Sequence, residues 1–168
     1  MRIMPSVSHW CFHVWVSAWN NLARFLAVLE SVQVALGIDF GLNTWGLATG
    51  NTLMQTATPL KALKVKQGKP DWTVFLQVMR EWRVDVIILG LPLNMDGTDQ
   101  PLTKKVRKMA ITLADKTQKP VQFQDERLST VEAKAILFEE GGYRSLQKEK
   151  IDSISAKIIL EDWFTSLI

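Results

Sequence analysis

The sequence is poor in cysteine and histidine. Its 168 residues include one cysteine, Cys11, and two histidines, His9 and His13. A single cysteine excludes an internal disulfide bond and any metal site built on a pair of cysteines. Both histidines lie in the N-terminal segment, apart from every other candidate residue, so neither a histidine-based zinc site nor Ser-His-Asp chemistry is expected. Any catalytic chemistry must therefore depend on carboxylates.

The sequence also lacks an apolar run of the ~18 residues that a membrane-spanning helix needs. Its most apolar segment, residues 1–32, is interrupted by Asn20 and Asn21 and has no clean small-residue cleavage site for a signal peptide. We expect residues 1–32 to be an N-terminal extension outside the main fold, as a start codon placed too far upstream would produce. An amphipathic helix that packs on the domain or on a partner is the alternative.

The composition is that of one soluble domain, which we place at residues 33–168. Hydrophobic residues make up 47% of the chain and charged residues 22%, which is typical of a globular protein. The length allows a single domain of usual size. The net charge of +3 is only a weak indication of a polyanionic partner.

Hydrophobic periodicity predicts an α/β fold. The expected strands span 34–41, 44–50, 57–65, 84–91 and 120–124, and the expected helices begin near Asp71, Pro101, Ser129 and Glu149. Three sequential strands followed by βα units predict a mixed five-stranded sheet. In that sheet an antiparallel meander of three strands is joined to parallel strands, and helices flank it.

Asp39 is the first candidate site residue. Alternation along its strand places only small residues beside it on one face, which leaves space around its carboxylate. A charge in a buried strand is unfavourable unless it is paired or holds a metal ion. A plain cap of the following turn is the alternative.

Asp125 and Glu126 come next, at the carboxyl end of the strand expected at 120–124. Ligands gather at such strand ends in open α/β sheets. Neighbouring side chains point in different directions, so we expect only one of the two to reach the site of Asp39. The other would bond Arg127 or a backbone group, and a solvated acidic turn is the alternative for the whole segment.

Asp152 lies on the last expected helix and shares a face with Ser155 and Ala156. These small side chains would let the helix approach the sheet closely, with Asp152 directed toward it. The alternative is a first-turn carboxylate favoured by the helix dipole.

Together the carboxylates predict a site for a hard divalent cation, because Mg²⁺ and Mn²⁺ prefer oxygen ligands. Two such ions can activate a water and stabilise the leaving oxygen of a phosphodiester. Three groups of basic residues are candidate phosphate contacts. They are Lys61, Lys64, Lys66 and Lys69; Lys104, Lys105, Arg107 and Lys108; and Lys134, Arg144, Lys148 and Lys150.

Five motifs in order carry a family resemblance. They are Gly37-Ile38-Asp39-Phe40-Gly41, Gly90-Leu91-Pro92, Asn94-Met95-Asp96-Gly97, Asp125-Glu126-Arg127-Leu128-Ser129-Thr130 and Asp152. In this order they closely resemble the YqgF family, the bacterial RuvX-type Holliday junction resolvases, also described as nucleases that process precursor small-subunit ribosomal RNA. The resemblance covers residues 34–164. Residues 1–32 are extra, and Ser155 stands where the family often has alanine.

The resemblance implies an RNase H-like fold, a cytoplasmic location and nuclease chemistry dependent on Mg²⁺ or Mn²⁺. It implies catalytic roles for Asp39, Asp125, Glu126 and Asp152, of which Asp39, Glu126 and Asp152 would bind metal. We expect substrate contacts from Asn94, where a turn precedes a helix N-terminus, and from Arg127 and Thr130. The expected partners are nucleic acid and ribosomal particles, with no membrane.

The expected reaction is hydrolysis in the 5′ end maturation of pre-16S rRNA, with branched, Holliday-junction-type DNA as another substrate. A non-catalytic RNA- or ribosome-binding assembly factor is the alternative. The run GIDFGLNTWG also resembles the first phosphate loop of the actin-like ATPases and sugar kinases. Those proteins need two such domains around a nucleotide, and this chain has room for one.

Overall fold

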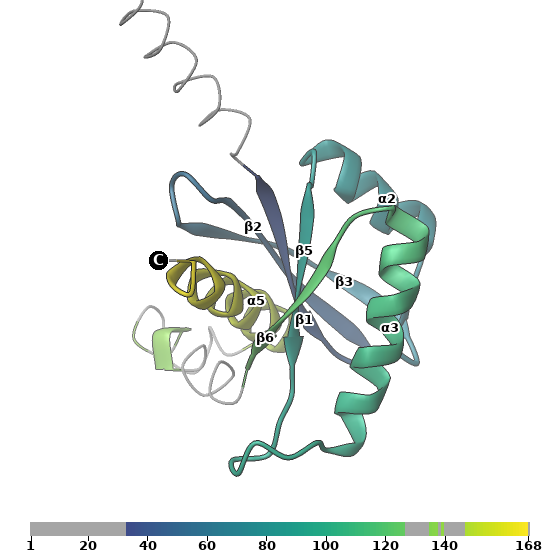
Figure 1. The fold of residues 1–168 in the computed structure, drawn as a ribbon, viewed down its shortest axis with the longest axis vertical. Coiled ribbons are helices and arrows are strands. Elements are labelled where there is room, and N and C mark those ends of the chain that lie inside the picture. Colours follow the sequence, from purple (N-terminus) through teal and green to yellow (C-terminus); the bar gives the residue numbers. More distant parts are fainter. Residues whose placement is uncertain (1–32, 127–134, 138, 140–146, 168) are drawn as a thin grey trace, which may run out of the picture. The chain divides into compact units, whose positions relative to one another are not determined.

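The computed structural model describes residues 33–126, 135–137, 139 and 147–167. The strands are β1 (Val34–Phe40), β2 (Thr44–Asn51), β3 (Ala57–Lys66), β4 (Lys69–Pro70), β5 (Val86–Leu91) and β6 (Val121–Asp125). The helices are α2 (Trp72–Glu81), α3 (Pro101–Thr117) and α5 (Lys148–Thr165) (Figure 1). The extension expected at residues 1–32, and most of the helix expected from Ser129, lie outside the described residues.

The strands form one mixed sheet in the order β4-β3-β2-β1-β5-β6. Strands β1, β2 and β3 pair antiparallel, whereas β5 is parallel to both β1 and β6. This confirms the predicted α/β fold and its meander, but the predicted count of five strands is wrong, because the sheet has six. Between β3 and β4, Gln67 and Gly68 have φ angles of 52° and 76°, and Lys66 pairs with Lys69. Two positive φ values make the tight hairpin turn that returns β4 against β3.

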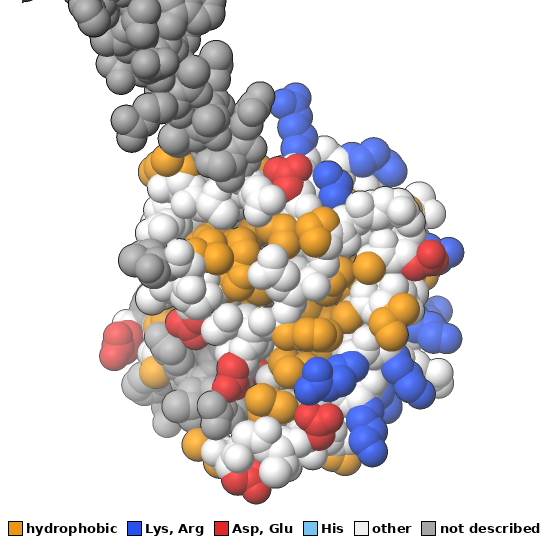
Figure 2. Space-filling model, in the orientation of Figure 1, with side chains coloured by type: hydrophobic (Ala, Val, Ile, Leu, Met, Phe, Trp, Pro, Cys, Tyr) orange, Lys and Arg blue, Asp and Glu red, His pale blue; other side chains and the backbone are white. Residues whose placement is uncertain are grey.

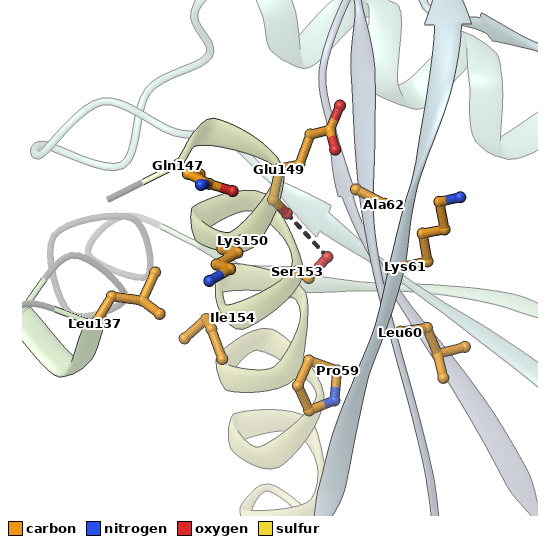
Figure 3. Close-up of a pocket in the computed structure, with 10 residues that line it drawn as sticks. All are labelled: Pro59, Leu60, Lys61, Ala62, Leu137, Gln147, Glu149, Lys150, Ser153 and Ile154. Carbon is orange, nitrogen blue, oxygen red and sulfur yellow. Dashed lines mark hydrogen bonds between the residues drawn. The ribbon is translucent and has the colours of Figure 1, made fainter. Parts of the chain in front are cut away.

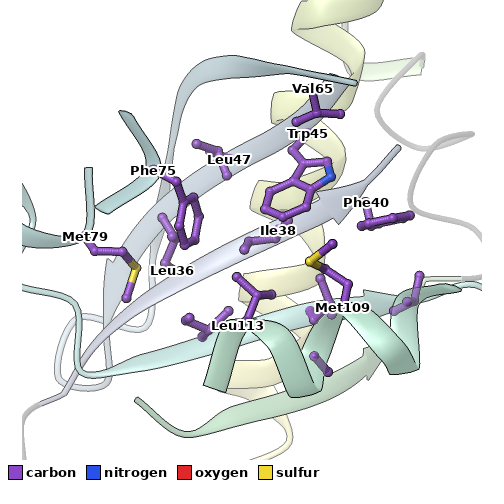
Figure 4. Packing of buried hydrophobic residues seen from close by; sticks show 14 of the residues in the cluster. Leu36, Ile38, Phe40, Trp45, Leu47, Val65, Phe75, Met79, Met109 and Leu113 are labelled. Atoms are coloured by element: carbon purple, nitrogen blue, oxygen red, sulfur yellow. The ribbon is translucent and has the colours of Figure 1, made fainter. Parts of the chain in front are cut away.

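Helices α2 and α3 cover one face of the sheet and α5 covers the other (Figure 1). The larger side chains of β1, among them Leu36 and Ile38, join the core under α2 and α3, as strand alternation predicted. Figure 4 shows this core, in which Trp45 of β2 meets Phe75 of α2 edge to face with ring centroids 5.7 Å apart. Its apolar packing holds the strands that carry the candidate residues.

The helix starts follow from local chemistry. Asp71 caps α2, because its carboxylate accepts a hydrogen bond from Thr73 N at 2.9 Å, as its sequence position predicted. Helix α3 begins with Pro101, whose missing N–H would have no partner in the first turn in any case. In the described part of the chain, no helix has the length and apolar character to cross a lipid bilayer.

On β1 and β2, the α5 face of the sheet carries small residues, among them Ala35, Gly37 and Ala48. A Cβ built on Gly37 would lie 2.7 Å from the carbonyl oxygen of Ala156, so the helix backbone rests almost directly on β1. Ser155 and Ala156 are fully buried against this face. Close approach brings the polar groups of α5 near the sheet, which determines where the carboxylates meet.

Candidate active site

Asp39 and Asp152 lie on the same face of the sheet. Asp39 pairs with Gly46 of β2, and residues directly opposite in an antiparallel pair point to the same face. The space that a Cβ of Gly46 would fill is occupied by the carbonyl oxygen of Asp152. Glycine at position 46 therefore allows the first turns of α5 to lie beside Asp39.

Glu126 reaches this face from the other side of β1. Its carboxyl group occupies the space next to Gly90, where a side chain would otherwise lie. Ile38 of β1 is in register with Leu89 of β5, and Asp39 and Gly90 each come one residue later. A second glycine thus makes room for a second carboxylate next to Asp39.

The side chain of Asp125 points to the opposite face of the sheet from that of Glu126. Asp125 is in register with Leu91, whose side chain belongs to the core under α2 and α3. Residues in register on parallel strands share a face, so Asp125 is directed away from the face that Asp39 occupies. The expectation that only one residue of the pair reaches Asp39 agrees with this geometry, and that residue is Glu126.

The acidic residues raise one another's pKa values. Burial raises the pKa of Asp39 to about 7, the charge of Asp152 adds to this rise, and Lys148 opposes it. Burial raises the pKa of Glu126 to about 9, and the charges of Asp39 and Asp125 add to it. At neutral pH Glu126 is therefore mainly protonated and Asp39 about half protonated, and a nearby positive charge favours the ionised form of both.

Lys148 is the cation of this site. The pKa of Asp152 is raised by burial and by Glu149, whereas Lys148 lowers it, as it does for Asp39. Sequence reasoning placed Lys148 only among general phosphate contacts and missed its position beside the carboxylates. The available signal was its spacing, one helical turn before Asp152 on the same helix.

The side chains of Asp39, Glu126 and Asp152 fit a hard divalent cation, because all three offer oxygen ligands. They lie in a partly buried place where their negative charges repel one another, and a cation would relieve that repulsion. Within the described residues, however, no group of three Asp, Glu, His or Cys side chains is arranged to hold an ion directly. Mg²⁺ keeps several waters and is commonly bound through one or two carboxylates. The residues therefore fit an ion held partly through water.

A pocket of about 470 Å³ lies between β3 and the start of α5 (Figure 3). Its lining comprises Pro59, Leu60, Lys61, Ala62, Leu137, Gln147, Glu149, Lys150, Ser153 and Ile154. Ser153, next to Asp152, donates a hydrogen bond to the carbonyl oxygen of Glu149 at 3.0 Å. The walls combine apolar side chains with two lysines, Lys61 and Lys150.

Asn94 lies in the turn that follows β5. Its side-chain amide donates to Thr98 Oγ1 at 2.8 Å and to the carbonyl oxygen of Asp99 at 3.4 Å. Asp96 accepts from the backbone N–H of Thr98 at 2.9 Å, and Gly97 has the positive φ of 84° that closes the turn. The amide hydrogens of Asn94 thus serve the turn itself.

The remaining predicted residues divide into two groups. Arg127 and Thr130, together with the basic residues Lys134 and Arg144, lie outside the described residues. The basic residues of β3 and α3 are described, and Lys104, Lys105, Arg107 and Lys108 are all exposed. Exposed cations on α3 are available for contacts with phosphate.

Comparison with known proteins agrees with the resemblance seen in the motifs. Proteins from Escherichia coli K12 and Salmonella arizonae, both named "Putative pre-16S rRNA nuclease", are 52% and 53% identical over 129 residues, which span 77% of this chain and 94% of each relative. The structure of Thermus thermophilus RuvC in complex with Holliday junction substrate matches with a TM-score of 0.50 and 15% identity, covering 80% of this chain and 95% of that one. This likeness shows the RNase H-like fold. A family model described as "RuvX: Holliday junction resolvase" matches residues 33–166, and the chain belongs to this family.

Proposed function

We propose that this protein is a metal-dependent nuclease that hydrolyses phosphodiester bonds in the 5′ end maturation of pre-16S rRNA. The observation that carries the proposal is the meeting of Asp39, Glu126 and Asp152 on the α5 face, where two glycines leave room for them. The names of the bacterial relatives support the ribosomal RNA substrate. The family description supports branched DNA as another substrate.

Asp39, Glu126 and Asp152 would hold Mg²⁺ or Mn²⁺, whereas Asp125, which faces the other side of the sheet, would act through its charge, which raises the pKa of Glu126. The bound ion supplies activation of a water and stabilisation of the leaving oxygen. The protein's own residues prepare the site. Because the pKa values of Asp39 and Glu126 are raised, these groups would release protons when a cation binds. Before the cation binds, the positive charge of Lys148 partly offsets the negative charges of Asp39 and Asp152.

The substrate would approach along basic surfaces on both sides of the acidic residues. Lys61 and Lys150 line the pocket between β3 and α5, and the cations of α3 lie on the opposite face of the sheet, over β5 and β6. Asn94 would shape the turn that meets the substrate backbone, and Arg127 and Thr130 would add contacts. We further propose that residues 33–168 are the functional domain, that residues 1–32 lie outside it, and that the protein acts on ribosomal particles in the cytoplasm.

A cleavage panel tests the function. A pre-16S rRNA fragment, a plain RNA duplex and a four-way DNA junction are incubated with the full chain in Mg²⁺, in Mn²⁺ and in EDTA. We expect metal-dependent cleavage of the rRNA fragment, and a loss of at least about 100-fold in Asp39→Asn, because even groups behind metal ligands contribute 10- to 100-fold. Asp115→Asn, which neutralises an exposed carboxylate on α3, is the matched control and should keep full activity.

The alternative function, a non-catalytic RNA-binding assembly factor, draws support from one observation. In the described part of the chain, three potential ligands are not arranged to hold an ion directly. Tight binding of the rRNA fragment without cleavage in either metal, unchanged by Asp39→Asn, would favour this alternative and overturn the nuclease.

A further inference from the structure

Helix α3 carries a stripe of cations that the acidic site does not use. Lys104, Arg107, Lys108 and Ile111 have offsets of 3, 4 and 7 residues, which place them on one face of the helix. All four side chains are exposed, and Ile111 is 73% exposed. The stripe thus combines three cations with one exposed apolar side chain.

Phe123 lies under this stripe on β6, the edge strand of the sheet. It is 39% exposed, and the guanidinium of Arg107 lies 5.6 Å from the centre of its ring. Arg107 also forms an ion pair with Asp99, with 3.3 Å between the guanidinium nitrogen and the carboxylate oxygen. The aromatic ring of Phe123 and the guanidinium of Arg107 therefore lie next to each other at the edge of the sheet.

The surface of the molecule shows the same combination. Figure 2 shows hydrophobic side chains gathered across the middle of the face that includes β6, with Lys and Arg side chains beside them over α3. Acidic side chains lie there too, but the cations beside the apolar patch favour a partner that carries negative charge. Nucleic acid has both flat apolar bases and negative phosphates.

We propose that Phe123 and the α3 stripe bind an unpaired segment of the nucleic acid next to the scissile bond. This inference rests on the proposed function for the identity of the ligand. A base would stack on Phe123 and Arg107, while Lys104 and Lys108 contact phosphates on either side. Only an unpaired base can offer its flat face to a side chain, so the surface selects single strands rather than duplex.

Position on the strand connects this surface to the acidic site. Phe123 comes three residues before Glu126, which corresponds to a distance of about 10 Å along a strand. Phe123 is in register with Leu89 and faces the α3 side, whereas Glu126 faces α5. The nucleic acid would therefore pass around the β6 edge, and nucleotides flanking the cleaved bond would reach Phe123.

The test measures binding in EDTA, where cleavage does not occur, with the full chain and fluorescence anisotropy. The probes are an RNA hairpin with a single-stranded overhang and the same hairpin without it. We expect Phe123→Leu to weaken binding of the overhang RNA roughly 5- to 150-fold, since stacking on an aromatic side chain is worth about 1–3 kcal/mol per base. Binding of the blunt hairpin should stay unchanged.

Matched variants control for stability and for general loss of an aromatic side chain. Phe123→Trp should restore overhang binding, and Trp82→Leu, which removes a 40% exposed ring at the C-cap of α2, should have no effect. The double variant Lys104→Gln with Lys108→Gln changes only exposed side chains. It should lower the salt dependence of overhang binding, with a slope reduced by about 1–2.

The inference would be overturned if Phe123→Leu bound each RNA as tightly as the unmodified protein does. It would also be overturned if Phe123→Leu weakened binding of the overhang RNA and of the blunt hairpin by the same factor. Self-association of the RNA-free protein that Phe123→Leu abolishes would overturn it too, since the surface would then be a protein contact. Because binding is measured without metal, a protein that never cleaves RNA but shows the selective loss would support this inference while refuting the nuclease.

Discussion

The carboxyl group of Glu126 lies where a side chain of residue 90 would be, so the acidic site depends on Gly90 having none. Ile159 of α5 also lies close, with its Cδ1 2.7 Å from the position of a Cβ at residue 90. A larger residue would have to displace either the carboxylate or the helix.

Gly90→Ala is expected to move Glu126 away from Asp39 and to reduce cleavage by about 10-fold or more, as the loss of a correctly placed group at a metal site does. Overpacking should also lower the free energy of unfolding by about 1–3 kcal/mol. Steady-state cleavage rates and urea unfolding measure the two effects.

Ile87→Val on the same strand is the stability control. Ile87 is fully buried on the opposite face, and its truncation should lower the free energy of unfolding by about 0.5–1.5 kcal/mol without moving a carboxylate. Equal losses of activity in the two variants would mean that Gly90→Ala acts through stability alone.

The metal-free protein should lose stability as the pH rises. The pKa of Asp39 is raised from 3.8 to about 7 and that of Glu126 from 4.5 to about 9. Between the unfolded and folded values the native state binds more protons than the unfolded chain, so the free energy of unfolding falls with pH from about pH 4 to about pH 9.

Urea unfolding in EDTA across this pH range measures the decline. Asp39→Asn cannot ionise, so we expect its stability to fall less steeply and to exceed that of the unmodified protein at pH 8. Parallel curves for the two proteins would show that Asp39 does not titrate in this range.

Metal affinity should show the opposite trend. Entry of Mn²⁺ requires the ionised forms of Asp39 and Glu126, whose pKa values are about 7 and about 9. We expect Mn²⁺ to bind tighter by up to about 10-fold per pH unit and per proton released, because metal and protons compete for the same oxygens. Isothermal titration in buffers of different ionisation enthalpy counts those protons, and pH-independent affinity would contradict the assignment.

Asn94→Ala tests the turn after β5. The alanine variant lacks the side-chain amide that donates hydrogen bonds to Thr98 and Asp99, so we expect a looser turn. The KM for RNA should rise several-fold with little change in kcat. Thr112→Ala, on the far part of α3, is the control. An unchanged KM would mean that the segment is only a tight turn.

Removal of residues 1–32 should leave the domain folded. Residues 33–168 form a compact unit by their own contacts, and both hydrophobic clusters are built from them. We expect the melting temperature of the shortened protein to stay within about 2 °C of that of the full chain, because the described core is complete without residues 1–32. A markedly lower melting temperature would make the N-terminal segment part of the fold.

Local sequence patterns were sufficient for most elements. The alternation in β1, the capping position of Asp71 and the apolar run of β5 each depend on residues close in the chain, because hydrophobic periodicity and capping are local effects. The five motifs, taken in their order along the chain, were sufficient to predict the family. The strand β4 was missed because Gln67 adopts a positive φ, which its residue type does not indicate.

The arrangement of the site was decided by tertiary structure. Which residue of Asp125 and Glu126 faces Asp39 depends on the register of β6 against β5, and a shift by one residue would exchange them. The importance of Gly46 and Gly90 appears only when α5 and Glu126 lie against the sheet. The contact between Arg107 and Phe123 likewise joins a helix and an edge strand. The sequence determined which chemical groups are present, whereas the pairing of distant strands and the docking of helices determined which of them meet.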